Sequence, residues 1–240
     1  MRWRDPLLLI AILLAGWQLL YLAVGDVGLS SPSRTVRNVT AMLGDARFLP
    51  HIRETLLAFT QAFAIALAAG LLIGLTLGAS RLTGEVAEPI LVALYSIPKV
   101  TLYPVILLVF GIGMPAKVAF GAIHGIVPIS LFAMNAIRNI APVHLRTARV
   151  LRLSPVETAG KILLRAALPE IVTGIRVGFS LTLIGTLLGE MFGAQRGLGF
   201  LLMQAMSLHE MERIMSITLV LVVFAAAVNA VLLALERRLG

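Results

Sequence analysis

The sequence predicts an all-α, polytopic membrane protein with six transmembrane helices. Of the 240 residues, 59% are hydrophobic and only 13% are charged, whereas soluble domains average about half apolar and about a quarter charged residues. The apolar residues also form runs close to the roughly 20 residues that a membrane helix needs. We therefore expect one transmembrane domain over residues 1–240, with its core at about 56–235.

The apolar runs are separated by polar connections, of which Gly25–Thr55 is the first long one. The run that follows it is uncharged and rich in Gly and Ala. Small residues let helix backbones approach closely in lipid, so we expect this span, with Ala68, Ala69, Gly70, Gly74 and Gly78, to pack inside the bundle. The predicted spans are Leu7–Val24, Leu56–Ser80, Pro89–Ile112, Val118–Ile137, Ile171–Leu188 and Ile214–Leu235.

The formal net charge is +8. In a soluble protein this excess would suggest a nucleic-acid partner, but the basic residues lie mostly in loops between apolar runs, as the positive-inside bias of membrane proteins predicts. We expect no nucleic-acid binding, and the bias places both termini and the central loop in the cytoplasm. The chain has no cysteine, which excludes disulfides, thiol nucleophiles and thiolate metal sites.

The central loop, Arg138–Pro169, predicts two short helices. The first would begin after Pro142 and carry Arg146, Arg149 and Arg152 at three-residue spacing beside an apolar stripe. Such a helix suits docking against a protein or a membrane surface, although an ordinary solvated basic loop explains the spacing equally well.

The second helix of the loop has a recognisable start. Ser154 can cap it, Pro155 suits the first helical position, and Glu157 can reach back to the cap. We expect this helix to end at Leu168, because Pro169 disfavours helical backbone in the residue before it.

Motifs of enzymes are scarce. The four histidines lack the spacing and the neighbouring acids of a zinc site. No glycine-rich phosphate loop with a following Lys is present. We expect no catalytic residue, no metal and no cofactor, so that any ATP would be hydrolysed on a separate partner.

Lys99 falls near the middle of the third predicted span. A basic group at the bilayer centre costs about 2.5–3.5 kcal/mol on insertion scales, and prolines are tolerated there where the backbone lines a cavity. We therefore expect Ser96, Pro98, Lys99 and Thr101 on a translocation path, where Lys99 would attract anions. Alternatively, the prolines shift the helix and Lys99 reaches an interface.

Asn135 and Glu190 are further polar candidates for the path. Glu190 has a second interpretation, in which it pairs with Arg176 or Arg196 and fixes the outer mouth. Asn135 also has a second interpretation, in which it forms a hydrogen bond between helices. Proton coupling is disfavoured, because no chain of intramembrane acids accompanies Glu190.

From Ala148 through Arg165–Ile171 to the Gly174–Gly199 run, the chain resembles permease subunits of binding-protein-dependent ABC importers of the nitrate, sulfonate and taurine type. In that family a Glu-Ala-Ala motif, with a Gly four residues after its second Ala, marks a coupling helix that sits in a cleft of the ATPase. Here Arg146-Thr147-Ala148 stands at the Glu-Ala-Ala position and Arg152 at the Gly position.

The resemblance implies an ATP-driven importer of a small, anionic solute in a bacterial cytoplasmic (inner) membrane. Its partners would be cytoplasmic ATP-binding cassette ATPase subunits, an external solute-binding protein and a second permease copy in a homodimer. A self-contained, ion-coupled secondary transporter is the alternative, and it predicts paired broken helices and several buried acids. The implied coupling residues are Arg146, Thr147, Ala148, Arg149, Arg152, Ser154, Pro155 and Glu157.

Overall fold

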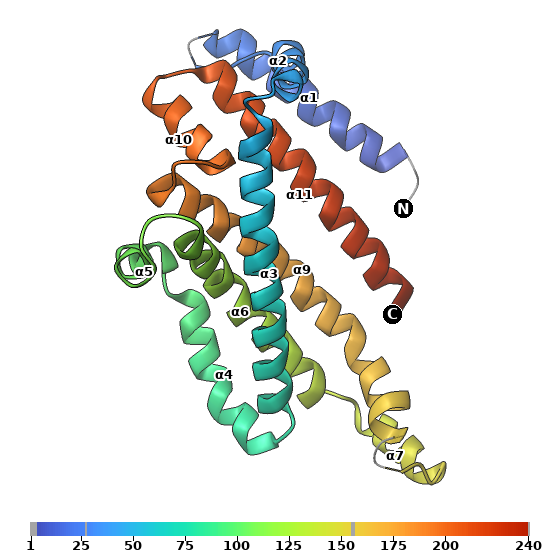
Figure 1. The fold of residues 1–240 in the computed structure, drawn as a ribbon. Coiled ribbons are helices and arrows are strands. Elements are labelled where there is room, and N and C mark those ends of the chain that lie inside the picture. The colour runs from blue at the N-terminus through green and yellow to red at the C-terminus, as the bar shows by residue number, and fades with distance from the viewer. Residues whose placement is uncertain (1–3, 27, 155–156, 240) are drawn as a thin grey trace.

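The structure is a computed structural model that describes residues 4–26, 28–154 and 157–239. Its regular elements in these ranges are all helical (Figure 1), which confirms the predicted fold class. In chain order they are α1 (Arg4–Val24), α2 (Pro32–Gly44), α3 (Leu49–Gly78), α4 (Arg81–Ser96), the 3-10 turn η1 (Lys99–Leu102), α5 (Tyr103–Phe110), α6 (Met114–Arg138), α7 (Pro142–Val150), the π-helical turn η2 (Thr158–Leu163), α9 (Leu164–Gly193), α10 (Leu198–Ser207) and α11 (Met211–Leu239).

Three long helices form the core, and α6 lies between α3 and α9. Gly121 of α6 shows how closely the helices approach. A Cβ added there would lie 2.9 Å from the Cβ of Ala62 on α3 and would also collide with the hydroxyl of Thr186 on α9. Helices in lipid associate largely through such close packing, because the lipid tails supply no hydrophobic force between them.

Small residues spaced four apart make one face of α3. Residues at this spacing lie above one another on a helix, and a Cβ at Gly70 would lie only 2.7 Å from Ile129 of α6. The expectation that this span packs inside the bundle is confirmed for its glycines, whereas Ala68 is exposed and Ala69 is half-buried. The buried residues of this face are Ala58, Ala62, Ala66, Gly70, Gly74 and Gly78.

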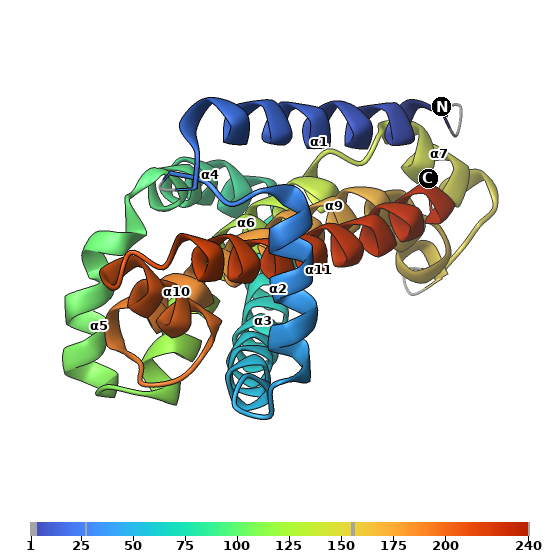
Figure 2. The same cartoon turned by 90° about the horizontal axis from the view of Figure 1, so that it is seen from above.

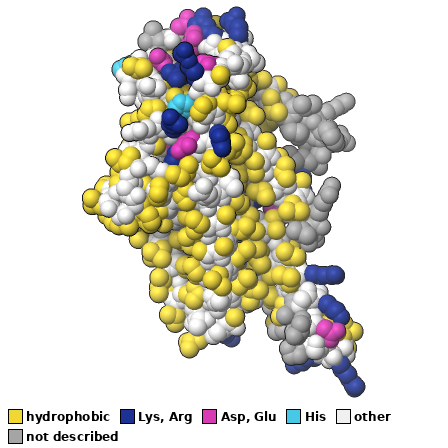
Figure 3. All heavy atoms as spheres, viewed as in Figure 1, with side chains coloured by type: hydrophobic (Ala, Val, Ile, Leu, Met, Phe, Trp, Pro, Cys, Tyr) yellow, Lys and Arg dark blue, Asp and Glu magenta, His cyan; other side chains and the backbone are white. Residues whose placement is uncertain are grey.

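On the face seen in Figure 3, hydrophobic side chains cover the middle of the molecule, and charged side chains gather at the top and at the lower right. Four helices in the described ranges are long and apolar enough to cross a membrane. A fifth span results if α4 and α5 are counted as one bent pair, and α1 contributes a shorter apolar stretch, Leu8–Val24. The predicted number of six is therefore not confirmed.

The predicted third span, Pro89–Ile112, is not one straight helix. α4 ends at Ser96, and the combined η1–α5 segment continues at an angle of 82° to it. Pro98 has no backbone N–H to continue the helix, and Ile97 and Pro98 have extended ψ values of 132° and 89°. Lys99 therefore lies in a turn.

The predicted fifth span, Ile171–Leu188, lies within a longer helix, and the predicted helix end at Leu168 is wrong. α9 begins at Leu164 and passes through Pro169 to Gly193. The disfavoured conformation before a proline is a preference, and in membrane helices local π-helical turns, such as the adjacent η2, help to accommodate proline. Packing stabilises the helix on both sides of Pro169, because Ala167 and Ile171 are buried in one cluster with Ala136 of α6.

The Gly25–Thr55 connection is largely helical. Ser31 caps α2 by accepting a hydrogen bond from the backbone N–H of Arg34. The first two turns of α2 contact α11, because the guanidinium of Arg34 and the amide of Asn38 both donate to Glu212. α2, α10 and the start of α11 together form the end of the molecule that lies opposite α7 (Figure 1), called the α10 end below.

α1 lies at the edge of the molecule in both ribbon views (Figures 1 and 2). Its principal contacts within the chain are with α2. Most of its described side chains, including Leu8, Leu13 and Leu19, are exposed. The first span is therefore an apolar helix with little packing against the core.

Candidate functional site

α7 forms part of the other end of the molecule, called the α7 end (Figure 1). The helix has nine residues, and Ala148 is its buried anchor, with 4% of its surface exposed. Arg146, Thr147 and Arg149 are exposed. α7 thus presents basic side chains on a short helix that packs mainly against η2.

Arg152 lies beyond the end of α7. Its φ of +50° is in the left-handed region, where a residue with a Cβ is disfavoured by about 1–2 kcal/mol. The turn is closed by backbone hydrogen bonds from Arg152 N to Arg149 O and from Leu153 N to Ala148 O, which satisfy carbonyls at the helix end. The predicted stripe is therefore split, with Arg152 in a turn that glycine would suit better.

Ser154 and Glu157 make the reciprocal hydrogen bonds that their spacing predicts. The backbone N–H of Glu157 donates to Ser154 Oγ at 3.3 Å, and that of Ser154 donates to Glu157 Oε2 at 3.1 Å. Pro155 lies outside the described residues. Hydrogen bonds lower the pKa of Glu157 to about 2, with the one from Lys161 as the largest cause and those from Ser154 next. Glu157 is therefore ionised at neutral pH.

Four candidate path residues meet at the α4–α5 bend. Ser96, Pro98 and Thr101 are exposed, and Lys99 is half-buried. Lys99 Nζ donates to the carbonyl of Tyr95 at 3.1 Å and lies 5.4 Å from the centre of the Tyr95 ring. The bend thus gathers a cation and two hydroxyls on one exposed surface.

Asn135 and Glu190 lie away from the α4–α5 bend, on α6 and α9. Asn135 is half-buried near the last turn of α6, and its Oδ1 is buried without a hydrogen-bond partner in the described part of the chain. Glu190 is completely buried near the end of α9. The structure does not bring either residue to the α4–α5 bend.

Glu190 is paired with a lysine that the sequence did not suggest as its partner. Lys117 Nζ, on α6, lies 3.6 Å from Glu190 Oε1 and 2.8 Å from Glu54 Oε1. Arg176, one of the two predicted partners, instead pairs with Glu236 at 2.9 Å. Arg196 is the other predicted partner, and its backbone carbonyl accepts a hydrogen bond from Lys117 at 3.4 Å.

The same carboxylate holds the start of α10. Glu190 Oε2 accepts from the N–H of Gly199 at 3.0 Å, and the hydroxyl of Thr55 accepts from the N–H of Leu198 at 2.7 Å and donates to Glu190. These are N–H groups of the first helical turn, which have no partner within the helix. The Lys117–Glu190–Thr55 cluster therefore joins α3, α6 and α9 to α10.

Gly197 allows this contact. Its φ is +125°, and a Cβ there would overlap the Glu190 carboxylate. Its N–H donates to His51 Nδ1 at 3.2 Å, so that three successive N–H groups, of residues 197–199, are held by side chains of α3 and α9. The sequence shows Gly197, Leu198 and Gly199 in succession, but it does not indicate their partners.

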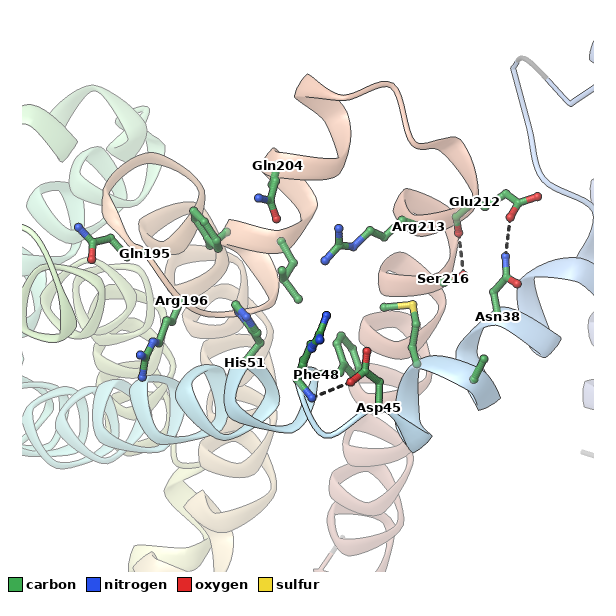
Figure 4. Close-up of a pocket in the computed structure, with 15 residues that line it drawn as sticks. Asn38, Asp45, Phe48, His51, Gln195, Arg196, Gln204, Glu212, Arg213 and Ser216 are labelled. Carbon is green, nitrogen blue, oxygen red and sulfur yellow. Dashed lines mark hydrogen bonds between the residues drawn. The ribbon is translucent and has the colours of Figure 1, made fainter.

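A cavity of about 720 Å³ lies at the α10 end (Figure 4). Basic and amide side chains of α3, the α9–α10 loop, α10 and α11 line it, beside apolar side chains. The arginines of the α9–α11 region were the available sequence signal, although their convergence was not foreseen. The labelled lining residues are Asn38, Asp45, Phe48, His51, Gln195, Arg196, Gln204, Glu212, Arg213 and Ser216.

Known proteins share this architecture. The fold matches a methionine ABC transporter solved in inward-facing conformations, with a TM-score of 0.68 at 21% identity over 80% of this chain and 95% of that one. It also matches a chain of an amino acid ABC transporter, with a TM-score of 0.61 at 18% identity over 88% of this chain and 100% of that one.

Sequence comparison gives the family. The chain is 26% identical to a putative aliphatic sulfonates transport permease protein of Bacillus subtilis, over 99% of this chain and 87% of that protein. It is 25% identical to a taurine transport system permease protein of Escherichia coli, over 100% of this chain and 92% of that protein. The family model of binding-protein-dependent transport system inner membrane components matches residues 66–240. The chain belongs to this family and is a permease subunit of an ABC importer.

Proposed function

We propose that two copies of this chain form a path for a small anionic solute across a bacterial inner membrane. Cytoplasmic ATPase subunits dock on α7 and the turn that follows it. An external solute-binding protein delivers the solute to the α10 end. Both chain termini are cytoplasmic, and residues 1–240 act as one transmembrane domain.

The observation that carries the proposal is the placement of α7. On the face seen in Figure 3, an apolar region separates two groups of charged side chains, and α7, with exposed Arg146 and Arg149, lies at one of them. A docked motor could move the bundle through this point, because α7 packs on η2 and η2 leads directly into α9. Packed elements switch between discrete arrangements rather than deforming smoothly.

Two features support a second copy. α1 is apolar and has little packing within the chain. The α4–α5 bend leaves Ser96 and Thr101 exposed beside Lys99, and a cation at bilayer depth should face protein or water rather than lipid. A partner chain at this bend would place Ser96, Pro98, Lys99 and Thr101 along a shared aqueous path.

The same lysine and the names of the relatives support the proposed solute class. The proteins compared above are named for aliphatic sulfonates and taurine, and a further relative is named for nitrate import. All of these solutes carry an oxyanion group. A lysine with three rotatable donors can attract such a group without fixing its geometry.

Reconstitution with candidate ATPase and binding-protein partners tests the proposal. We expect taurine or nitrate uptake only with ATP and both partners present. Replacing Arg146 and Arg152 together by Glu should abolish ATPase association. Arg81→Glu is the matched control, because Arg81 is an exposed arginine at the first position of α4, outside the loop, and this variant should associate normally.

The secondary-transporter alternative predicts a different result. It requires two broken helices, one in each of two related halves. The described ranges contain a single broken span, which consists of α4 and α5. Uptake by the chain without any ATPase or ATP would establish this alternative and reject the importer. Unchanged ATPase association after the double replacement of Arg146 and Arg152 would reject the docking surface.

A further inference from the structure

We infer that the cavity at the α10 end is a binding site for a small oxyanion, which holds the sulfonate, carboxylate or nitrate group of a solute before it enters the membrane part of the path. The inference rests on the proposed function for the direction in which the cavity faces. Four observations support it, namely the basic groups, the engaged acids, the shape of the cavity and the fixed wall.

The basic groups come from three separate elements. Arg47 precedes α3, Arg196 lies in the α9–α10 loop and Arg213 lies in the first turn of α11. Within the described residues, neither Arg47 nor Arg196 forms an ion pair, and Arg213 pairs only with Glu210, at 3.3 Å. Guanidinium groups bind planar oxyanions through paired N–H donors, which makes arginine the preferred residue for such ligands.

The two acids at the cavity are already engaged. Asp45 Oδ1 accepts from the backbone N–H of Arg47 at 2.8 Å. Glu212 accepts from Arg34 through one oxygen and from Asn38 through the other. Figure 4 shows Glu212 directed toward Asn38, whereas Arg213 extends into the cavity. The lining carries three arginines against these two carboxylates, one of which is paired with Arg34, so it keeps an excess of positive charge.

The shape of the cavity suits a small organic anion. Its volume of about 720 Å³ lies within the roughly 300–1,000 Å³ of small-molecule sites. Phe48, Phe200 and Leu201 give it an apolar wall, and the His51 ring stacks on Phe200 with centroids 6.1 Å apart. An apolar wall beside arginines matches a ligand with a short carbon chain and one charged head, as in taurine.

The wall that carries Arg196 is held in place before any ligand binds. The carbonyl of Arg196 accepts from Lys117, and the N–H groups of the next three residues donate to His51, Thr55 and Glu190. A site that is already ordered loses less entropy when its ligand binds. The Lys117–Glu190–Thr55 cluster is thus the support of the cavity wall.

The test measures binding to the full chain in lipid nanodiscs, without ATPase, ATP or binding protein. Equilibrium dialysis with radiolabelled taurine, and competition by methanesulfonate and nitrate, should show saturable binding. Arg196→Gln and Arg213→Gln should each weaken taurine binding about tenfold or more. Gln204→Glu, which adds a negative charge and leaves every arginine in place, should weaken it as well.

Arg37→Gln is the matched control, because Arg37 is an exposed arginine of α2 that does not line the cavity. It should bind taurine like the parent chain. Absence of saturable binding to the parent chain would overturn the inference, as would equal losses in Arg37→Gln and Arg213→Gln. A separate assay adds the solute-binding protein, and arginine variants that lose affinity for that protein but keep taurine binding would also overturn the inference, since the cavity would then be a protein-docking surface.

The outcomes also separate this inference from the proposed function. ATP-dependent uptake by the complete complex without oxyanion binding to the bare chain rejects only the cavity site. Oxyanion binding together with uptake that needs no ATPase rejects only the importer mechanism.

Discussion

The ammonium of Lys117 lies 3.6 Å from the carboxylate of Glu190, and both side chains are buried inside the helical core. The pair is one part of a larger arrangement, because Lys117 also contacts Glu54 and Glu190 also caps α10. Removing one partner of a buried ion pair leaves a charge without compensation, which costs about 3–5 kcal/mol. Because each residue of the pair has a different further partner, we expect replacement of Lys117 and replacement of Glu190 to lower the stability by different amounts.

Lys117→Met should destabilise the protein more than Glu190→Gln does. The lysine replacement leaves two carboxylates, Glu54 and Glu190, without their shared cation, and we expect a loss of about 3–5 kcal/mol. The Glu190→Gln variant would keep an acceptor for Thr55 and Gly199 and would leave the Lys117–Glu54 pair intact, so we expect about 1–3 kcal/mol. Unfolding in mixed micelles measures both losses, and the reverse order would contradict the arrangement.

Gly197→Ala should destabilise the protein more than Gly113→Ala does. Both glycines have nearly the same left-handed φ, +125° and +128°, but a Cβ at Gly113 meets nothing within 4 Å, whereas one at Gly197 overlaps the Glu190 carboxylate. We expect about 1–3 kcal/mol from the backbone conformation in both variants and an additional loss only at Gly197. Equal melting temperatures would show that Glu190 does not occupy this position.

Arg152→Gly should stabilise the protein. Glycine adopts a φ of +50° without the cost that a Cβ imposes, so we expect a gain of up to about 1 kcal/mol. Arg146→Gly is the control, because Arg146 lies inside α7 and glycine in a helix interior costs about 1 kcal/mol. The melting temperature should rise for Arg152→Gly and fall for Arg146→Gly. A fall in both would argue against the left-handed turn.

The Glu157 carboxylate should titrate far below its ordinary pKa of 4.5. The hydrogen bond from Lys161 is the largest cause of the shift to about 2, and a depressed pKa means that the ionised form stabilises the folded turn. This contribution is complete above about pH 4.5 and is lost as the pH falls toward about 2. Carbon-13 NMR of labelled glutamate should show the low midpoint in the parent chain.

Lys161→Ala should move this midpoint upward, and Lys161→Arg should leave it near the parent value because the positive charge is kept. A midpoint that is the same in the parent chain and in Lys161→Ala would contradict the contact between Lys161 and Glu157.

The sequence predicts local features of this protein well. The Ser154–Glu157 cap depends on residues three apart, and the packing face of α3 follows from small residues four apart, so both can be found by spacing alone. The family resemblance also identified the permease, because residues 138–199 carry the motif positions together in one stretch.

Features that depend on tertiary packing could not be predicted. Lys117 and Glu190 lie on different helices, and no local pattern joins them. Pro98 and Pro169 carry the same local signal, yet the helix breaks at Pro98 and continues through Pro169, because the buried neighbours of Pro169 hold α9 in place. The α10-end cavity is formed by segments that are far apart in the chain, so its basic residues gave no pattern of their own.

Labelling of single cysteines tests whether the α7 and α10 ends lie on opposite sides of the membrane. The chain has no cysteine of its own, so Arg146→Cys and Gln204→Cys variants each report one exposed position. In intact right-side-out vesicles, a membrane-impermeant maleimide should label the Gln204→Cys variant, and it should label the Arg146→Cys variant only after permeabilisation. Labelling of the Arg146→Cys variant in intact vesicles would place α7 on the outer face and contradict its role as the docking site of an internal ATPase.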